Sequence, residues 1–168
     1  TGGYTVGWCE TPPSPTLTSS VPYVMGDVVD NFTLSDQYGQ DVDLYSFCDR
    51  SVLIMSAAAW SSPDVVMAAT LQSYQDAYRD DGLQIIVLLF SDAYGDPPDT
   101  SELMAFADGA GISDIPVLSD SSTTLVDSVF GAFEHDFYIP SLSFLDTDMT
   151  ALSVDEMLSI SELIDTHL

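Results

Sequence analysis

The sequence predicts an α/β domain in which a central mixed sheet carries helices on both faces. Two uninterrupted apolar runs, 51–59 and 83–90, are typical of strands that are buried on both faces of a sheet. A segment with helical periodicity separates these runs, and further helix-like and strand-like segments alternate towards the C-terminus. The length of 168 residues fits one domain with a tail.

The elements before the second buried strand have clear local signals. Alternating runs on either side of the turn 36–39 predict strands at 31–35 and 41–47. After the strand 51–59, a serine followed by proline and an acid marks a helix start, and this helix is expected to continue to about Arg79. One face of this helix is apolar, and its members are Met67, Leu71, Tyr74 and Tyr78.

The elements after the strand 83–90 have weaker signals, and they complete a β, β, β-α-β-α-β-α-β-β-α order. They are a helix at 99–109 capped by Thr100 or Ser101, a strand at 115–118, a helix at 121–132, a hairpin of 141–145 and 149–154, and a helix from near Asp155 to the terminus.

The charge of the chain excludes two classes of partner. The sequence holds 27 acidic residues against two arginines and no lysine, so the formal charge is −25. Nucleic acids and anionic membrane surfaces both recruit clusters of Lys and Arg, so neither is an expected partner. An acidic shell repels itself over roughly 10 Å at moderate salt. Such an acidic shell is expected of a protein that works at high salt or at low pH, or that only needs to be soluble. Its carboxylates also allow weak binding of divalent cations.

The first 25 residues are predicted to be an irregular extension ahead of a domain at 26–168. They are rich in Gly, Pro, Ser and Thr, and they show no apolar targeting or membrane-spanning run. We expect an exported protein, periplasmic, secreted or at the cell surface, whose targeting segment is absent from this chain. Cys9 in the extension and Cys48 in the body are the only cysteines. A disulfide between them would tie the extension to the domain, and two independent buried thiols are the alternative.

Four landmarks stand in the order of a known family. They are 26–39 with Asn31-Phe32-Thr33-Leu34, 42–47, the turn 59–64, and Ile139-Pro140 ahead of the strand 141–145. In this order and spacing, residues 26–168 resemble the redoxin branch of the thioredoxin superfamily, which includes the AhpC/TSA peroxiredoxins and thiol-disulfide oxidoreductases. The resemblance implies a thioredoxin-like three-layer fold, with Pro140 as the family's cis-proline.

The resemblance fails at the residues that carry the family's chemistry. The segment Trp60-Ser61-Ser62-Pro63-Asp64 stands where the family has its Trp-Cys-x-x-Cys turn. The family's first cysteine acts as a thiolate at a helix N-terminus, and the second resolves the mixed disulfide. Serine does not ionise comparably and neither Ser61 nor Asp64 can form a disulfide, so we expect a helix cap without redox chemistry. We expect Asp64 to hold a permanent negative charge there.

Other chemical readings are weaker. An activated serine needs a base, and the histidines are His135 beside two acids and His167 near the end. Cys48 lies about 20–25 Å from the turn, at the other end of a strand, which disfavours a peroxidatic role. The segment from Asp146 to Thr150, with Asp146 and Asp148 as ligands, begins like a calcium loop but lacks its glycine and final glutamate.

Three functions remain open at this stage, and none calls for a cofactor. The first is a non-catalytic binding or scaffold module that takes an extended peptide beside Pro140, in a groove formed by Trp60, Tyr138 and Ile139. The second is a working oxidoreductase or antioxidant protein that uses Cys9 and Cys48. The third is an acidic surface protein whose function is to bind cations.

Overall fold

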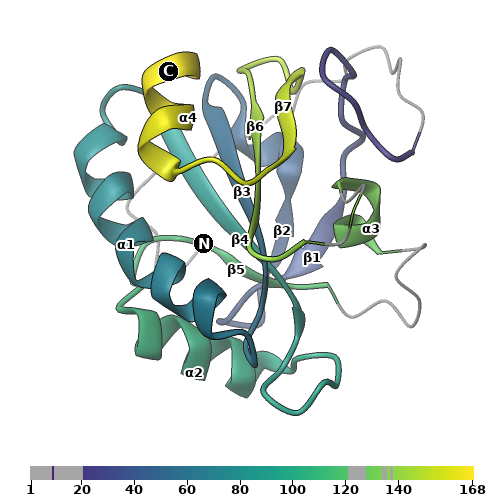
Figure 1. Ribbon diagram of the computed structural model, residues 1–168, viewed down its shortest axis with the longest axis vertical. Coiled ribbons are helices and arrows are strands. Elements are labelled where there is room, and N and C mark those ends of the chain that lie inside the picture. Colours follow the sequence, from purple (N-terminus) through teal and green to yellow (C-terminus); the bar gives the residue numbers. More distant parts are fainter. Residues whose placement is uncertain (1–8, 10–20, 121–127, 134–135, 137) are drawn as a thin grey trace.

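A computed structural model describes Cys9 and residues 21–120, 128–133, 136 and 138–168 of this chain. Its centre is a five-stranded mixed sheet in the order β5-β4-β3-β6-β7, and a two-stranded sheet of β1 and β2 lies beside it (Figure 1). The elements are β1 (Thr33–Ser35), β2 (Asp41–Asp43), the 3₁₀-helix η1 (Leu44–Phe47), β3 (Ser51–Ala58), α1 (Ser62–Tyr78), β4 (Leu83–Ser91), α2 (Thr100–Ala110), β5 (Val117–Ser119), α3 (Val129–Phe133), β6 (Ser141–Leu145), β7 (Ala151–Glu156) and α4 (Ile160–His167).

The two apolar runs form the centre of the sheet, as the sequence predicts. β3 and β4 pair in parallel, from Ser51 opposite Leu83 to Ala57 opposite Leu89. Every residue of β3 is buried, because helices or loops cover both faces of this strand. β6 runs antiparallel to β3 on its other side, with Ser56 opposite Ser141, so the start of β6 lies at the carboxyl end of β3.

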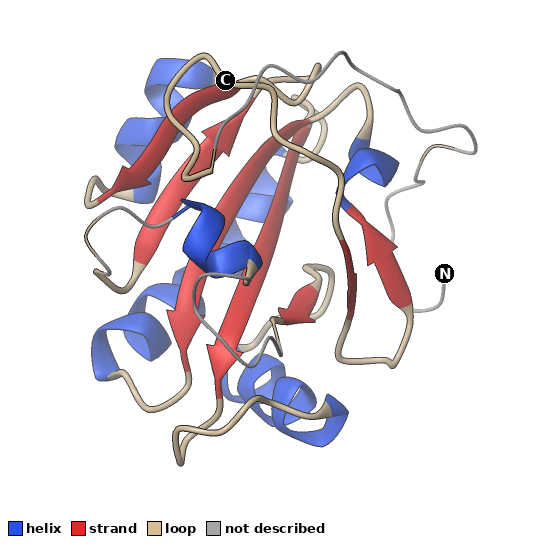
Figure 2. Cartoon of the chain, turned by 90° about the vertical axis from the view of Figure 1, so that its right-hand side faces the viewer, coloured by secondary structure: helices blue, strands red, loops and turns tan. Residues whose placement is uncertain are grey.

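Alternate residues of the central strands enter two different cores, because successive side chains in a strand point to opposite faces. Leu53 and Met55 join the core formed with α1, α2 and α4. Val52 and Ile54 join the core formed with η1, β2 and α3. Figure 2 shows α3 and the β1–β2 pair on the near face of the sheet, with α1, α2 and α4 behind it. The expected three-layer arrangement is therefore confirmed.

Two helix starts differ from the sequence-based expectation. α2 is capped by Asp99 rather than Thr100 or Ser101, because the Asp99 carboxylate accepts the NH groups of Ser101 and Glu102 at 2.8 and 3.0 Å. A carboxylate at this position also favours the positive end of the helix dipole.

The last helix also begins later than expected. A start near Asp155 is wrong, because β7 continues to Glu156 and pairs with β6, and Asp155 has a left-handed φ of 54°. α4 instead begins after Ser159, which forms a capping box with Glu162.

Other elements also depart from their expected bounds, and the strands expected at 149–154 and 115–118 are β7 and β5. The expected strand 41–47 turns into η1 after Asp43. Of the expected helix 121–132, residues 121–127 lie outside the described part of the chain, and α3 covers Val129–Phe133. α3 begins where it does because the buried Asp120 carboxylate accepts the NH groups of Val129 and Phe130.

The N-terminal segment contacts the domain in two described places. Cys9 donates its NH to the carbonyl of Ser46 at 2.9 Å, and Tyr23 donates its NH to the carbonyl of Ala132 at 2.8 Å. The Tyr23 ring is buried and packs against Phe133 with ring centres 5.1 Å apart. The boundary at residue 25 stays a prediction, and Tyr23 belongs to the core. Among the described residues, no helix combines the length and apolarity that crossing a bilayer requires.

Candidate functional site

The candidate site lies at the carboxyl end of β3, where three segments of the chain meet. β3 leads through Ala59 and Trp60 into α1, and β4 ends at the same edge because it runs parallel to β3. Pro140 precedes β6, and the Ile139–Pro140 peptide bond is cis, as the resemblance implies. The turn and the proline therefore come together from positions about 80 residues apart in the sequence.

Ser61 and Asp64 form a closed hydrogen-bond unit in this turn. The Ser61 hydroxyl donates to Asp64 Oδ1 at 2.6 Å, and the Ala58 NH donates to Asp64 Oδ2 at 2.7 Å. Ser61 is 6% exposed and Asp64 is fully buried. Ser61 occupies the N-cap of α1, but its side chain bonds to Asp64 rather than to a backbone NH. The hydroxyl is thus already engaged and shielded from solvent.

The charge of Asp64 is less firmly held than the sequence predicts. Burial raises the pKa of Asp64, and the hydrogen bonds from Ser61 and Ala58 only partly oppose this rise. The expectation of a permanent negative charge therefore overlooks the loss of solvent. The burial of Asp64 depends on how the turn packs in the folded chain, and the local sequence does not show it.

Apolar side chains are exposed around the turn. Trp60 is 54% exposed and donates its indole NH to the Ser91 hydroxyl at 3.1 Å. Tyr138 is also exposed, and Ile139 is half-buried. These three residues lie on segments that reach the same edge of the sheet, and the groove between them stays a prediction.

A cavity of about 400 Å³ adjoins Pro140 and was not foreseen from the sequence. It lies between one face of α1 and the start of α4, and its lining residues are Pro63, Val66, Met67, Thr70, Tyr74, Pro140, Ser159 and Ile160. The helical spacing of Met67 and Tyr74 does mark this face as apolar. This face of α1 becomes a cavity wall only because α4 begins opposite it. The sequence-based prediction places the start of that helix too early, near Asp155.

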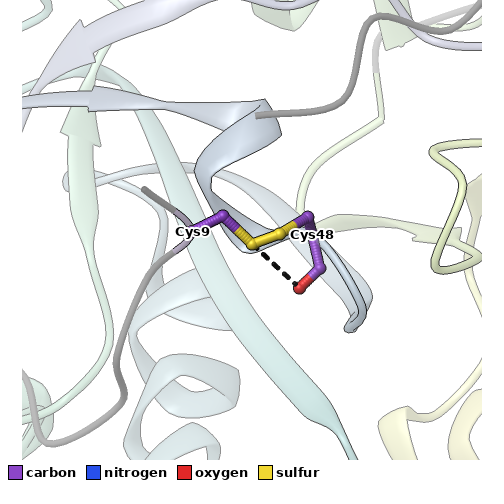
Figure 3. Close-up of a disulfide and its surroundings, with 2 residues drawn as sticks. All are labelled: Cys9 and Cys48. Carbon is purple, nitrogen blue, oxygen red and sulfur yellow. Dashed lines mark hydrogen bonds between the residues drawn. A yellow bond between two sulfur atoms is a disulfide. The ribbon is translucent and has the colours of Figure 1, made fainter. Parts of the chain in front are cut away.

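Cys9 and Cys48 form a disulfide, so the expected pairing is confirmed (Figure 3). Their Cα atoms are 6.0 Å apart, which is an ordinary separation for a disulfide. Cys48 precedes β3 and the turn with Ser61 follows it, so the length of β3, about 25 Å, separates the two. Both cysteines of the chain are thus bonded, far from the candidate site.

The remaining candidates do not join this site. Asp146 and Asp148 lie in the β6–β7 turn, where their carboxylates accept the NH groups of Thr147 and Thr150. In the described part of the chain, the one cluster of metal-binding residue types consists of the bonded cysteines and Asp49, and it does not include them. His167 packs against Phe144 with ring centres 5.4 Å apart, and His135 lies outside the described residues.

Comparison with known proteins identifies the family. The model of the AhpC/TSA family matches residues 25–153, which is more than half of the chain. The chain belongs to the AhpC/TSA family. A search of the curated proteins finds no match.

Solved structures confirm the thioredoxin-like fold. The thioredoxin domain of a thiol-disulfide oxidoreductase from Bacteroides vulgatus is 20% identical, with a TM-score of 0.64 over 84% of this chain and 94% of that one. A peroxidoxin from Mycobacterium tuberculosis is 18% identical, with a TM-score of 0.63 over 85% and 92%. A thiol peroxidase from Chromobacterium violaceum is 16% identical, with a TM-score of 0.61 over 90% and 89%. At these identities the likeness establishes the fold alone.

Proposed function

We propose that this AhpC/TSA-family chain is an exported binding or scaffold module without thiol-disulfide activity. The observation that carries the proposal is the buried Ser61–Asp64 hydrogen bond at the turn where the resemblance places the reactive cysteines. A side chain that is buried and already hydrogen-bonded is not available as a nucleophile, and no free thiol is present in the chain. The disulfide supports export, because such bonds persist in oxidising compartments.

The groove beside Pro140 is the proposed binding surface. In the family that the chain resembles, backbone next to the cis-proline pairs with an extended substrate segment. Here the 400 Å³ cavity at Pro140 and the exposed rings of Trp60 and Tyr138 provide apolar contact for such a segment. The proposed partner is therefore an extended peptide or a protein with an exposed strand.

An assay of insulin reduction and peroxide turnover tests the loss of chemistry. We expect no turnover by the natural chain above the uncatalysed rate. The variant Ser61→Cys/Asp64→Cys is expected to gain insulin reduction, since a cysteine at the α1 N-terminus acquires a lowered pKa. The single variant Ser62→Cys is the matched control, because it adds one thiol in the same turn but no resolving partner.

The rival function makes the opposite prediction. An oxidoreductase that uses Cys9 and Cys48 would turn over in its natural form and would lose activity in Cys48→Ala. This result would overturn the proposed function. The structure opposes the rival, because the disulfide lies at the far end of β3 from the turn and from Pro140.

A further inference from the structure

A second cavity, of about 380 Å³, lies on another face of the first turns of α1. Its walls come from α1, from the loop after β4 and from α2. Ala59, Val65 and Phe106 give it an apolar interior, and Asp92, Glu102 and Tyr94 bring polar groups to it. Its volume is at the low end of the range for sites that bind small molecules or single side chains.

Two carboxyl groups meet at this cavity. Asp92 and Glu102 both line it, Asp92 from the loop after β4 and Glu102 from the first turn of α2. Burial alone would raise the pKa of Asp92, but the hydrogen bonds from the NH groups of Asp96 and Tyr94 outweigh it and the net shift is downward. These bonds are 2.8 Å long. Asp92 is buried and lines the cavity, so its carboxyl group brings polar, acidic character to a largely apolar space.

No lysine or arginine of this chain neutralises the pair. The sequence has no lysine, and both arginines lie at the opposite end of α1 and β3. Arg79 pairs with Asp114 and Asp76, and Arg50 donates to the Arg79 carbonyl at 3.1 Å. Two carboxyl groups that line one largely apolar cavity favour a cation, because a cation offsets both their repulsion and their lost hydration.

We propose that this cavity binds an arginine side chain of the partner segment that lies beside Pro140, an inference that rests on the proposed function. A guanidinium group offers several planar donors and suits two adjacent carboxylates. Its methylene stem packs against apolar walls such as Val65 and Phe106. Tyr94 is 89% exposed and lines the same cavity, so its ring is available to stack on the guanidinium.

The position of the two cavities fixes the spacing of the partner sequence. The neighbouring residues Val65 and Val66 line the two different cavities, which therefore open on different faces of the same helix turn. A helix is about 10 Å across, and an extended chain advances about 3.3 Å per residue. The arginine is therefore three or four residues from the partner residue beside Pro140.

The cavity is tested with two small probes on the full chain. These are N-acetyl-arginine methylamide and its neutral counterpart, N-acetyl-citrulline methylamide, titrated while the amide signals of Ala105 and Gly109 are followed by NMR. We expect millimolar binding of the arginine probe and at least tenfold weaker binding of the citrulline probe. Equal affinity for both probes, or no shift at these amides, overturns the proposal.

Variants identify the carboxyl groups responsible. Glu102→Gln and Asp92→Asn are each expected to weaken arginine binding about fivefold to tenfold. Both keep the side-chain oxygen that accepts backbone NH groups, including the Asp99 NH, so the local fold is maintained. Glu156→Gln, which lines a different cavity, is the matched control for one lost charge and is expected to bind normally. Unchanged binding in both cavity variants overturns the proposal.

A panel of random peptides separates this inference from the proposed function. If the bound peptides carry arginine three or four residues from the residue that contacts Pro140, both the peptide-binding function and the arginine inference are supported. Peptides that bind at Pro140 without arginine enrichment overturn only the arginine inference. If the arginine probe binds selectively and no peptide binds, the cavity assignment is supported and the peptide-binding function is overturned.

Discussion

Removal of the Cys9–Cys48 disulfide is expected to destabilise the protein by about 4 kcal/mol. The two cysteines are 39 residues apart, and closing a loop of this length lowers the entropy of the unfolded chain by about 13 cal/mol/K. At 298 K this corresponds to about 4 kcal/mol of folding stability. For a domain of this size each kcal/mol moves Tm by about 2–4 °C, so we expect Tm to fall by about 8–16 °C.

The assay is urea unfolding and calorimetry of the variant Cys9→Ala/Cys48→Ala beside the natural chain at fixed pH and salt. The natural chain treated with dithiothreitol is the control, and its stability should match that of the variant. A loss of less than about 1 kcal/mol in both would refute the reasoning, because the bond would then not constrain the unfolded state. If the variant still binds peptide, the disulfide contributes to stability and is not required for peptide binding.

Two further predictions concern ionisation. Because burial raises the folded-state pKa of Asp64, the folded state holds this proton more tightly than the unfolded state does. In urea unfolding, the natural chain should therefore lose stability relative to Asp64→Asn as pH rises from about 4 through the raised pKa, and the exposed Asp80→Asn is the matched control for one lost charge. The charge of −25 predicts that Tm rises with NaCl from 0.1 to 1 M, as the screening length falls from about 10 to 3 Å. A saturable rise at low millimolar CaCl₂, at constant ionic strength, would instead support specific cation binding.

Much of the fold is predictable from local patterns. The runs 51–59 and 83–90 contain no charged residue. Such strands remove their side chains from water only inside a sheet that is covered on both faces. Helix ends were harder, because they depend on which side chain reaches a backbone NH. Asp99 caps α2 although Thr100 and Ser101 are equally good candidates by residue type.

The candidate site was predictable only in part. The order of the landmarks leads to the turn with Ser61 and Asp64 and to Pro140, and the fold brings these segments to one edge of the sheet. The cavity beside Pro140 was missed, because its far wall is the start of α4 and Asp155 does not begin that helix. The cavity lined by Asp92 and Glu102 was missed because its walls come from a loop and two helices that are separate in the sequence.

The sequence by itself determined which residue types stand at the turn and which charge the chain carries. Residue type decides these properties: serine and aspartate form no disulfide, and a chain without lysine has few cations wherever it folds. Only the tertiary structure decided that the pKa of Asp64 is raised and which groups share a cavity. The pKa of Asp64 depends on the removal of water by the packed core, and the cavity that Asp92 and Glu102 share depends on how α2 packs against α1 and β5. Both are effects of long-range packing, and local sequence does not encode them.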